Sequence, residues 1–229
     1  MDDLDGDGYA LADIVLARHQ CEHIASSLPA VTGSGRGGVR NLISHPTVIQ
    51  LLLHERFGAF VWSVIGRDLV AVKATLFDKT TDANWRVQWH QDRAIAVKER
   101  LQVSGYGPWS TKAGVLHVEP PAEVLAQMLS IRIHLDECGA ENGPMRVIPG
   151  SHRAGKLMEE ELAGLVAGGT TVELYAPQGT LLLMRPLLVH SSTSARAPQH
   201  RRVLHIEFAP AEAISPLQWH SAVQLRRAA

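Results

Sequence analysis

The feature that most constrains the fold is a change in hydrophobic period near residue 70. From there to about residue 210, apolar side chains recur at every second position in short runs bounded by glycine, proline or asparagine. Side chains alternate between the two faces of a β-strand, so these runs indicate strands with one apolar face. Several short strands of this kind are typical of a sandwich or barrel. We therefore predict an all-β core over about 70–210.

The alternation also predicts which side chains share a face. Residues 131–136, IRIHLD, place Arg132, His134 and Asp136 opposite three apolar side chains, and in VAVKATLFD the residues Val72, Ala74 and Leu76 share a face. If the apolar faces pack under N-terminal helices, the polar faces line the interior of the core. Further strands are expected in three runs: 87–92, 180–190 and 201–210.

The N-terminal quarter is predicted to be a helical layer over about 11–66. Residues 11–28 place apolar side chains at helical spacing, and Pro29 ends that run. Residues 44–66 indicate one or two helices after a Ser44 cap, with Pro46 in a first turn. The glycine-rich segment 33–38 between these helices is expected to be a loop.

Length and charge limit the classes of function. A chain of 229 residues suits a single domain over 1–229, and its net charge of -1 provides no positive field for nucleic acid. The acidic start has no signal-peptide pattern, and no apolar run is long enough to span a membrane. We expect a cytoplasmic protein that acts on a small molecule, without a nucleic-acid or membrane partner. The oligomeric state is not indicated.

A candidate metal site begins with His90 and Asp92. Two residues apart on a strand, they project from the same face and can bind one ion. His190, at the end of the predicted strand 180–190, is the expected third ligand, because a closed β core brings distant strands together. Two histidines and one carboxylate leave coordination positions open, as an iron(II) oxygenase requires. An isolated His-x-Asp pair is weak evidence, since such pairs also occur at solvated strand ends.

Arg201, eleven residues after His190, strengthens this hypothesis. A dicarboxylate that chelates iron at one end needs a cation at the other, and the arginine fork matches a carboxylate. Ser192 can add a hydroxyl to the same group. Arg202 is the rival to Arg201, but it alternates in phase with the apolar face of its strand. Alternation therefore predicts that Arg201 faces the metal.

A candidate lid follows the metal motif directly. Residues 93–121 are rich in glycine and proline and show no clear period, and loops of this length are usually functional or disordered. Trp109 in this segment is a candidate substrate contact, and pinning the loop is an equal alternative. His134 is a second candidate, and the alternative is that it and Arg132 satisfy each other and Asp136.

These motifs together resemble the phytanoyl-CoA dioxygenase family. The resemblance rests on WHQD at 89–92, NGPMRVIPGSH at 142–152, HSS at 190–192 and Arg201. It implies a double-stranded β-helix, a cupin-like jelly-roll barrel with flanking helices. It also implies an enzyme that uses iron(II), 2-oxoglutarate and dioxygen to oxidise a small organic substrate, with release of succinate and carbon dioxide.

The resemblance assigns roles to individual residues. It implies that His90, Asp92 and His190 bind iron, and that Arg201 and Ser192 bind the 2-oxoglutarate carboxylate. It places further co-substrate or substrate contacts at Lys73, Gln91 and Arg132. Because Asp92 is present, hydroxylation is favoured over halogenation. The alternatives are a metal-binding cupin-like barrel without turnover, or a zinc- or manganese-dependent isomerase or hydrolase that uses the same three ligands. The substrate itself is not indicated.

Overall fold

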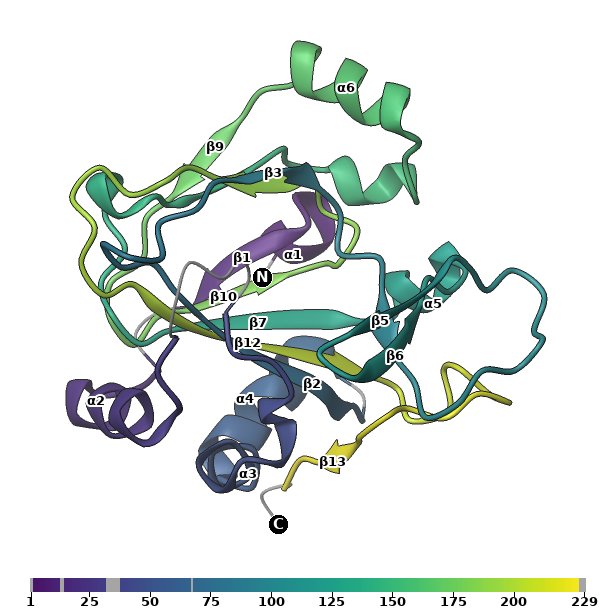
Figure 1. Cartoon of the computed structure of the whole chain (residues 1–229), viewed down its shortest axis with the longest axis horizontal. Helices are drawn as coiled ribbons and strands as arrows, with labels where there is room; N and C mark the ends of the chain where they lie inside the picture. The colour runs from purple at the N-terminus through teal and green to yellow at the C-terminus, as the bar shows by residue number, and fades with distance from the viewer. Residues whose placement is uncertain (1, 13–14, 32–37, 67, 227–229) are drawn as a thin grey trace.

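The computed structural model describes residues 2–12, 15–31, 38–66 and 68–226, and its core is a pair of facing β-sheets (Figure 1). The larger sheet has the strand order β1-β10-β7-β12-β2-β13, and the smaller has the order β3-β11-β8-β9. The larger sheet contains β1 (Tyr9–Ala12), β10 (Leu181–Met184), β7 (Leu129–His134), β12 (Arg202–Ala209), β2 (Val70–Asp78) and β13 (Val223–Gln224). The smaller contains β3 (Val87–His90), β11 (His190–Ser192), β8 (Met145–Val147) and β9 (Val172–Leu174).

The predicted fold class, a jelly-roll β core with flanking helices, is confirmed, although the two sheets do not close into a complete barrel. Helices cover the outer face of the larger sheet (Figure 1). Buried side chains from β7 and β12, such as Ile131, Ile133 and Leu204, form one apolar cluster with those helices. The covering helices are α2 (Arg18–Ser27), α3 (Pro46–Leu52) and α4 (Glu55–Ile65). Among the described residues, no helix is long and apolar enough to cross a membrane.

The predicted helix over 11–28 is wrong in its first part. Leu11 belongs to β1, which pairs with β10 at the edge of the larger sheet, and α2 begins only at Arg18. Edge pairing satisfies the backbone there and overrides the helical spacing. Residues 44–66 form two helices, and Pro46 is at a first helical position as predicted, but the cap is His45 and not Ser44. Most of the predicted loop 33–38 lies outside the described residues.

The predicted strand 180–190 is two strands in different sheets. β10 ends at Met184, the chain turns, and β11 begins at His190. This turn carries the chain from the larger sheet to the smaller one, so His190 starts a strand and does not end one. A second difference is at Val72, which packs with a separate apolar cluster and not with Ala74 and Leu76. A register shift between β2 and β12 at this point explains it, because a bulge reverses the alternation.

The candidate lid 93–121 contains a small third sheet of order β4-β6-β5 (Figure 1). Its apolar side chains, such as Ile95 and Val118, pack against the ends of β2 and β12. The strands are β4 (Ile95–Ala96), β5 (Trp109–Lys112) and β6 (Val115–Val118). The other short elements are α1 (Asp2–Gly6), α5 (Ala122–Ala126), α6 (Glu159–Gly168), and 3-10 turns at Leu42–Ser44, Ala140–Asn142 and Ser151–Ala154.

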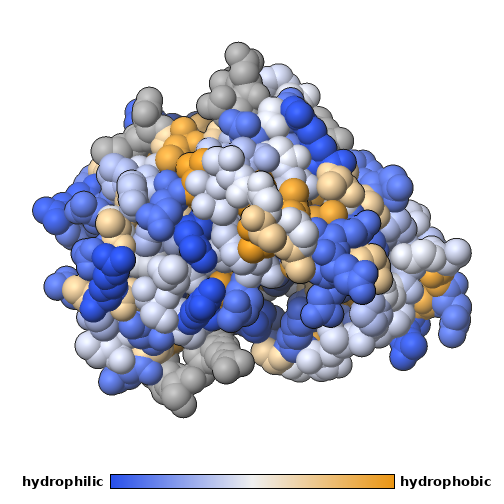
Figure 2. Space-filling view, turned by 90° about the horizontal axis from the view of Figure 1, so that it is seen from above, coloured by the Kyte–Doolittle hydropathy of each residue, from blue (hydrophilic) through white to orange (hydrophobic). Residues whose placement is uncertain are grey.

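Side-chain hydropathy on the outside of the molecule is mixed. In the face shown in Figure 2, hydrophilic side chains dominate and hydrophobic ones form only small groups. Small exposed apolar groups are normal for a folded chain and mark no binding surface by themselves.

Candidate metal centre and pocket

The structure brings the three predicted metal ligands together at one end of the inter-sheet space. β11 pairs antiparallel with β3, and this register places His190 directly opposite His90. Asp92 lies just beyond the end of β3, where its backbone N–H donates to the Pro186 carbonyl at 2.9 Å. Its two carboxylate oxygens lie 3.7 Å from Nε2 of His90 and 3.7 Å from Nε2 of His190. All three potential ligand atoms are within 4.8 Å of one another.

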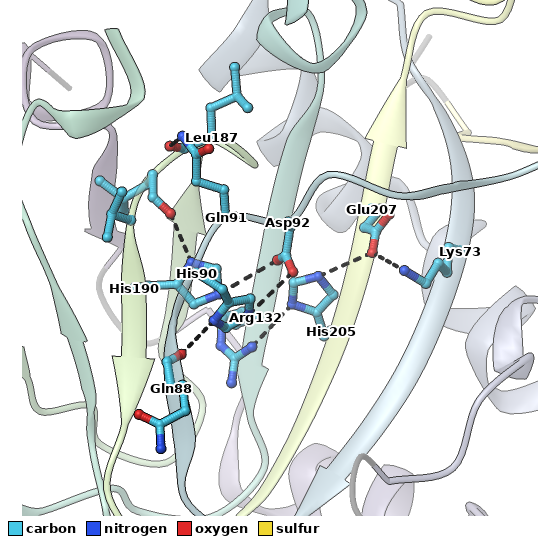
Figure 3. A network of polar contacts seen from close by, with 12 residues as sticks. Lys73, Gln88, His90, Gln91, Asp92, Arg132, Leu187, His190, His205 and Glu207 are labelled. Atoms are coloured by element: carbon cyan, nitrogen blue, oxygen red, sulfur yellow. Dashed lines mark hydrogen bonds and ion pairs between the residues drawn. The ribbon is translucent and has the colours of Figure 1, made fainter. Parts of the chain in front are cut away.

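Both histidine rings are held in the orientation that a metal requires. Nδ1 of His90 lies 2.8 Å from the Gln88 carbonyl, and Nδ1 of His190 lies 2.8 Å from the Leu188 carbonyl (Figure 3). A carbonyl accepts a hydrogen bond, so Nδ1 carries the proton in each ring. Nε2 is then left with its lone pair directed at Asp92, which is the usual outer-shell arrangement of a metal-binding histidine.

The protonation states of these residues also fit a cation. Burial, followed by the neighbouring His90, lowers the pKa of His190 to about 3, so its ring is neutral at physiological pH. Burial alone would raise the pKa of Asp92, but electrostatic interactions with the nearby imidazoles of His190, His205 and His90 hold that pKa well below its usual value. A neutral His190 imidazole and an ionised Asp92 carboxylate therefore suit a divalent metal with open coordination positions.

A pocket of about 590 Å³ opens beside these ligands, between the two sheets. The inner faces of β2, β7 and β12 supply one wall, as the alternation predicted. Across that wall a chain of polar contacts joins four side chains (Figure 3). Lys73 donates to Glu207 at 2.6 Å, Glu207 lies 3.6 Å from His205, and His205 lies 3.2 Å from Arg132.

Arg201 and Arg202 face in opposite directions, as the alternation predicted. The Arg201 side chain is buried and lines the pocket, and its Nε has no hydrogen-bond partner among the described residues. Arg202 points away and forms a two-pronged ion pair with Asp136, at 2.8 and 2.7 Å. Asp78 accepts a hydrogen bond from the Arg201 backbone N–H at 2.9 Å, which fixes the start of β12.

Lys79 is a pocket residue that the sequence analysis missed. It directly follows β2 and is completely buried, and its Nζ donates to Ser192 Oγ at 3.1 Å and to the Thr193 carbonyl. Burial and the nearby Arg201 charge lower its pKa to about 7. Gly143 has a positive φ, and a Cβ there would collide with the Thr193 carbonyl and lie 3.1 Å from the Lys79 nitrogen. The Asn142-Gly143 turn was visible in the sequence, but its contact with a lysine was not.

The remaining predicted residues divide between the pocket and its supports. Gln91 lines the pocket and ties three loops together: its side chain donates to two carbonyls, at Gly155 and Leu187, and accepts from the Leu157 N–H. His134 is buried outside the pocket lining, and its Nδ1 has no partner among the described residues. Asp136 does not bind His134 or Arg132, because it pairs with Arg202.

Trp109 lies on β5 outside the pocket lining, so the structure does not support it as a substrate contact. It packs against the apolar cluster of the third sheet, and Arg100 lies 5.3 Å from the centre of its ring. This is the loop-pinning alternative that the sequence left open. Four other residues of the 93–121 segment do line the pocket: Arg93, Ala94, Lys112 and Glu119.

The fold and the donor set define a jelly-roll protein with a candidate metal site of two histidines and one carboxylate beside a polar pocket. Comparison with known proteins gives the family. The phytanoyl-CoA dioxygenase model matches residues 28–203, most of the chain, so the chain belongs to that family and the resemblance is confirmed.

Among curated proteins, the chain is similar to L-proline trans-4-hydroxylase of Streptomyces griseoviridis, with 32% identity. That match covers 35% of this chain and 40% of the relative, so it spans well under half of the relative's length.

Solved structures share the fold. The epimerase SnoN, in complex with Fe3+, alpha ketoglutarate and nogalamycin RO, has a TM-score of 0.67 and 19% identity over 92% of this chain and 82% of its own. EctD from S. alaskensis with bound Fe has a TM-score of 0.66 and 19% identity, and covers 93% of this chain and 76% of that one. The predicted cofactors, iron(II) and 2-oxoglutarate, agree with the groups in these structures and with the donor set found here.

Proposed function

We propose that this protein is an iron(II)- and 2-oxoglutarate-dependent oxygenase that hydroxylates a small organic molecule. The observation that supports this most strongly is the pair of buried cations, Arg201 and Lys79, in the same pocket as the metal ligands. Neither side chain forms an ion pair with a carboxylate among the described residues. Burying unpaired charges is costly unless a ligand compensates them, and a dicarboxylate co-substrate supplies that charge.

In this proposal each polar group has a separate task. His90, Asp92 and His190 hold iron(II), which supplies the oxygen chemistry by which 2-oxoglutarate becomes succinate and carbon dioxide while the substrate is oxidised. Arg201 and Lys79 bind the far carboxylate of 2-oxoglutarate, and the Ser192 hydroxyl, already 3.1 Å from Lys79, adds a hydrogen bond. The Lys73, Glu207, His205 and Arg132 chain holds the facing wall rigid and leaves the open side for the substrate.

Hydroxylation is the reaction we favour within this class. The metal carboxylate, Asp92, is present, and the curated relative is by name a hydroxylase. SnoN is by name an epimerase, so the shared fold alone does not select the reaction. Two alternatives are a metal-binding barrel without turnover and a zinc- or manganese-dependent isomerase or hydrolase. Neither requires two buried cations in the same pocket as the metal ligands.

Two neighbouring arginines provide a matched test. We expect Arg201→Ala to weaken 2-oxoglutarate binding to the metal-loaded protein by about 100-fold, because it removes a buried charge-assisted contact worth roughly 2–3 kcal/mol. Arg202→Ala, next to it on β12 but paired with Asp136 on the other face, should change the affinity by less than about threefold. Calorimetric titration measures both. Unchanged affinity in the Arg201 variant would rule out the proposed co-substrate site.

A further inference from the structure

The pocket carries far more positive than negative charge. Eight arginine and lysine side chains line it, against three carboxylates, although the whole chain has a net charge of -1. Glu207 is paired with Lys73, Glu119 with Arg93 at 3.4 Å, and Asp92 is a metal ligand. A divalent metal adds two positive charges and a dianionic co-substrate adds two negative ones, so binding of both leaves this net excess unchanged. The excess positive charge therefore remains for a third molecule, which is the substrate.

Arg40 is one of the cations that line the pocket, and the backbone before it is firmly anchored. Val39 forms a two-way bridge with Leu76 of β2, with both N–H···O distances at 2.9 Å. Gly38 has a positive φ of 73° and passes so close to β2 that a Cβ would collide with the Leu76 carbonyl. Arg40 is thus fixed at the edge of the larger sheet and does not belong to a loose loop.

Lys112 is the second such cation and reaches the pocket from the third sheet. It is the last residue of β5, where Ala113 and Gly114 form the two-residue turn to β6. Their φ values are 48° and 78°, which matches a type I′ hairpin turn. Glycine adopts this backbone readily, but alanine rarely does, so the turn is strained at Ala113.

One hydrogen bond joins these two segments across 72 residues of sequence. The Asn41 side chain donates to the Ala113 carbonyl at 3.1 Å. Asn41 and Ala113 are the non-glycine residues with positive φ within the described ranges, and each directly follows one of the two cations. Strained backbone of this kind persists where the surroundings enforce it, often at binding sites.

The hydrogen bond between Asn41 and Ala113 places the backbones of two pocket-lining cations, Arg40 and Lys112, beside each other. Partial burial, then the charges of Lys73 and Arg40, lower the pKa of Lys112, and the carboxylates of Asp92 and Glu207 offset only part of this effect. In the part of the chain that the structure describes, neither Arg40 nor Lys112 forms an ion pair. Two like charges held together by strained backbone repel each other unless an anion lies between them.

We propose that Arg40 and Lys112 form an anion clamp that selects substrates carrying a carboxylate or phosphate group and holds this group at the mouth of the pocket. The inference rests on the proposed function, since it assigns the substrate class of the same site. The clamp leaves Arg201 and Lys79 to the co-substrate, so the two anions are bound by separate pairs of cations.

The test uses three ligands with the same ring: benzoate, phenyl phosphate and the neutral benzamide. Each is titrated into the full chain loaded with Ni(II) and saturated with 2-oxoglutarate. We expect at least one anion to bind about tenfold or more tightly than benzamide, since a charge-assisted pair contributes more than 1.4 kcal/mol. Which anion binds more tightly identifies the group. In the double variant Arg40→Gln, Lys112→Gln the preference should fall below about twofold.

A matched control is Arg18→Gln, which removes an exposed arginine on α2, far from the pocket lining. It should keep the full preference for the anion. Equal affinity for all three ligands in the unmodified chain would overturn the clamp, as would a preference that survives the double substitution. Because Arg40 is only half-buried and Lys112 is exposed, thermal melting of the double variant should match that of the unmodified chain.

The same variants separate a failure of the clamp from a failure of the proposed function. The affinity for 2-oxoglutarate should be unchanged in the double variant. A loss of this affinity would mean that Arg40 and Lys112 bind the co-substrate, and it would overturn the clamp. A failure of the unmodified chain to bind 2-oxoglutarate would instead contradict the proposed function. The comparison of acid with amide can still be made on the metal-loaded protein in that case.

Discussion

The two faces of the larger sheet come from the same strands but have opposite chemistry. The outer face of β7 and β12 presents Ile131, Ile133 and Leu204 to the helices, and all three are completely buried in an apolar cluster. The inner face of the same strands presents Arg132 and His205, which are also buried but polar. Side-chain alternation thus lets one strand stabilise the fold with one face and build a site with the other.

Within the described ranges, the inner face of the larger sheet contains buried polar atoms without hydrogen-bond partners, whereas the outer face is apolar, and this difference indicates separate roles for the two faces. Buried atoms without a partner among the described residues include Thr75 Oγ1, Arg132 Nε and Arg201 Nε, and all three belong to pocket-lining residues. Buried polar groups are usually satisfied, and a group of exceptions needs an explanation. On the outer face, burial of apolar area supplies stability at about 25 cal/mol per Å². The inner face therefore sacrifices some stability for ligand binding.

The largest effect on activity is expected for Asp92→Ala. It removes one of three metal ligands, and we expect the conversion of 2-oxoglutarate to succinate to fall by about 10³-fold or more, a loss of roughly 4 kcal/mol. The thermal stability should hardly change, because the site is on the inner face. Asp82→Ala, at an exposed aspartate, is the control and should retain full turnover. Undiminished turnover in the Asp92 variant would refute the metal assignment.

The opposite outcome is expected for the outer face. Leu204→Ala removes a completely buried side chain from β12 and should lower the free energy of unfolding by about 2–5 kcal/mol. The remaining folded protein should keep its affinity for 2-oxoglutarate, since Leu204 points away from the pocket. Urea denaturation and calorimetry measure the two quantities. A cost below about 1 kcal/mol would mean that the outer face does not carry the stability.

Lys79→Met should have a smaller effect than Asp92→Ala or Leu204→Ala, and it should change both the affinity for 2-oxoglutarate and the stability of the fold. In the empty pocket the Lys79 pKa is about 7, so its charge, and with it the affinity for 2-oxoglutarate, is lost as pH rises above 7. We expect the variant to bind about tenfold more weakly at pH 6, a loss of roughly 1.4 kcal/mol, and to lose this pH dependence. The charged groups around Lys79 are Arg201 and Arg132, and the Cys138 side chain is also nearby, so Cys138→Ser is the control and should keep the dependence.

The same substitution should stabilise the empty protein. The Lys79 pKa is lowered from 10.5 to about 7 on folding, so between these values the unfolded chain binds more protons than the folded one. The contribution of Lys79 to stability therefore rises with pH through that window and is least favourable below pH 7. Lys79→Met should melt at a higher temperature than the unmodified chain at pH 6, and a lower melting temperature would contradict the buried-charge interpretation.

The site was largely predictable because its residues are related by spacing and phase. His90 and Asp92 were predicted from their two-residue separation, and Arg201 was chosen over Arg202 by alternation alone. Lys79 was not predictable, because a buried and an exposed lysine look alike in sequence and only the three-dimensional contact with Ser192 distinguishes them. Whether Trp109 contacts substrate or pins the loop was left open, because a loop aromatic carries no information on which side it packs, and in the structure it lies outside the pocket lining.

The fold was less predictable where tertiary contacts override local pattern. The run at 180–190 is apolar on both sides of Arg185 and Pro186, because β10 and the residues that lead into β11 are buried, so no change of period marks the turn. Pro186 was the available signal, since proline interrupts central strands. Leu11 was assigned to a helix by its spacing, and only pairing with β10 makes it a strand residue. The helices of 44–66 followed their local signals and were predicted correctly in kind.

The most direct test of the account is a crystal structure of the protein grown with Ni(II) and 2-oxoglutarate. We predict anomalous density for the metal between His90, Asp92 and His190, and a co-substrate whose far carboxylate contacts Arg201 and Lys79. A metal bound elsewhere, or 2-oxoglutarate that avoids Arg201 and Lys79, would contradict it.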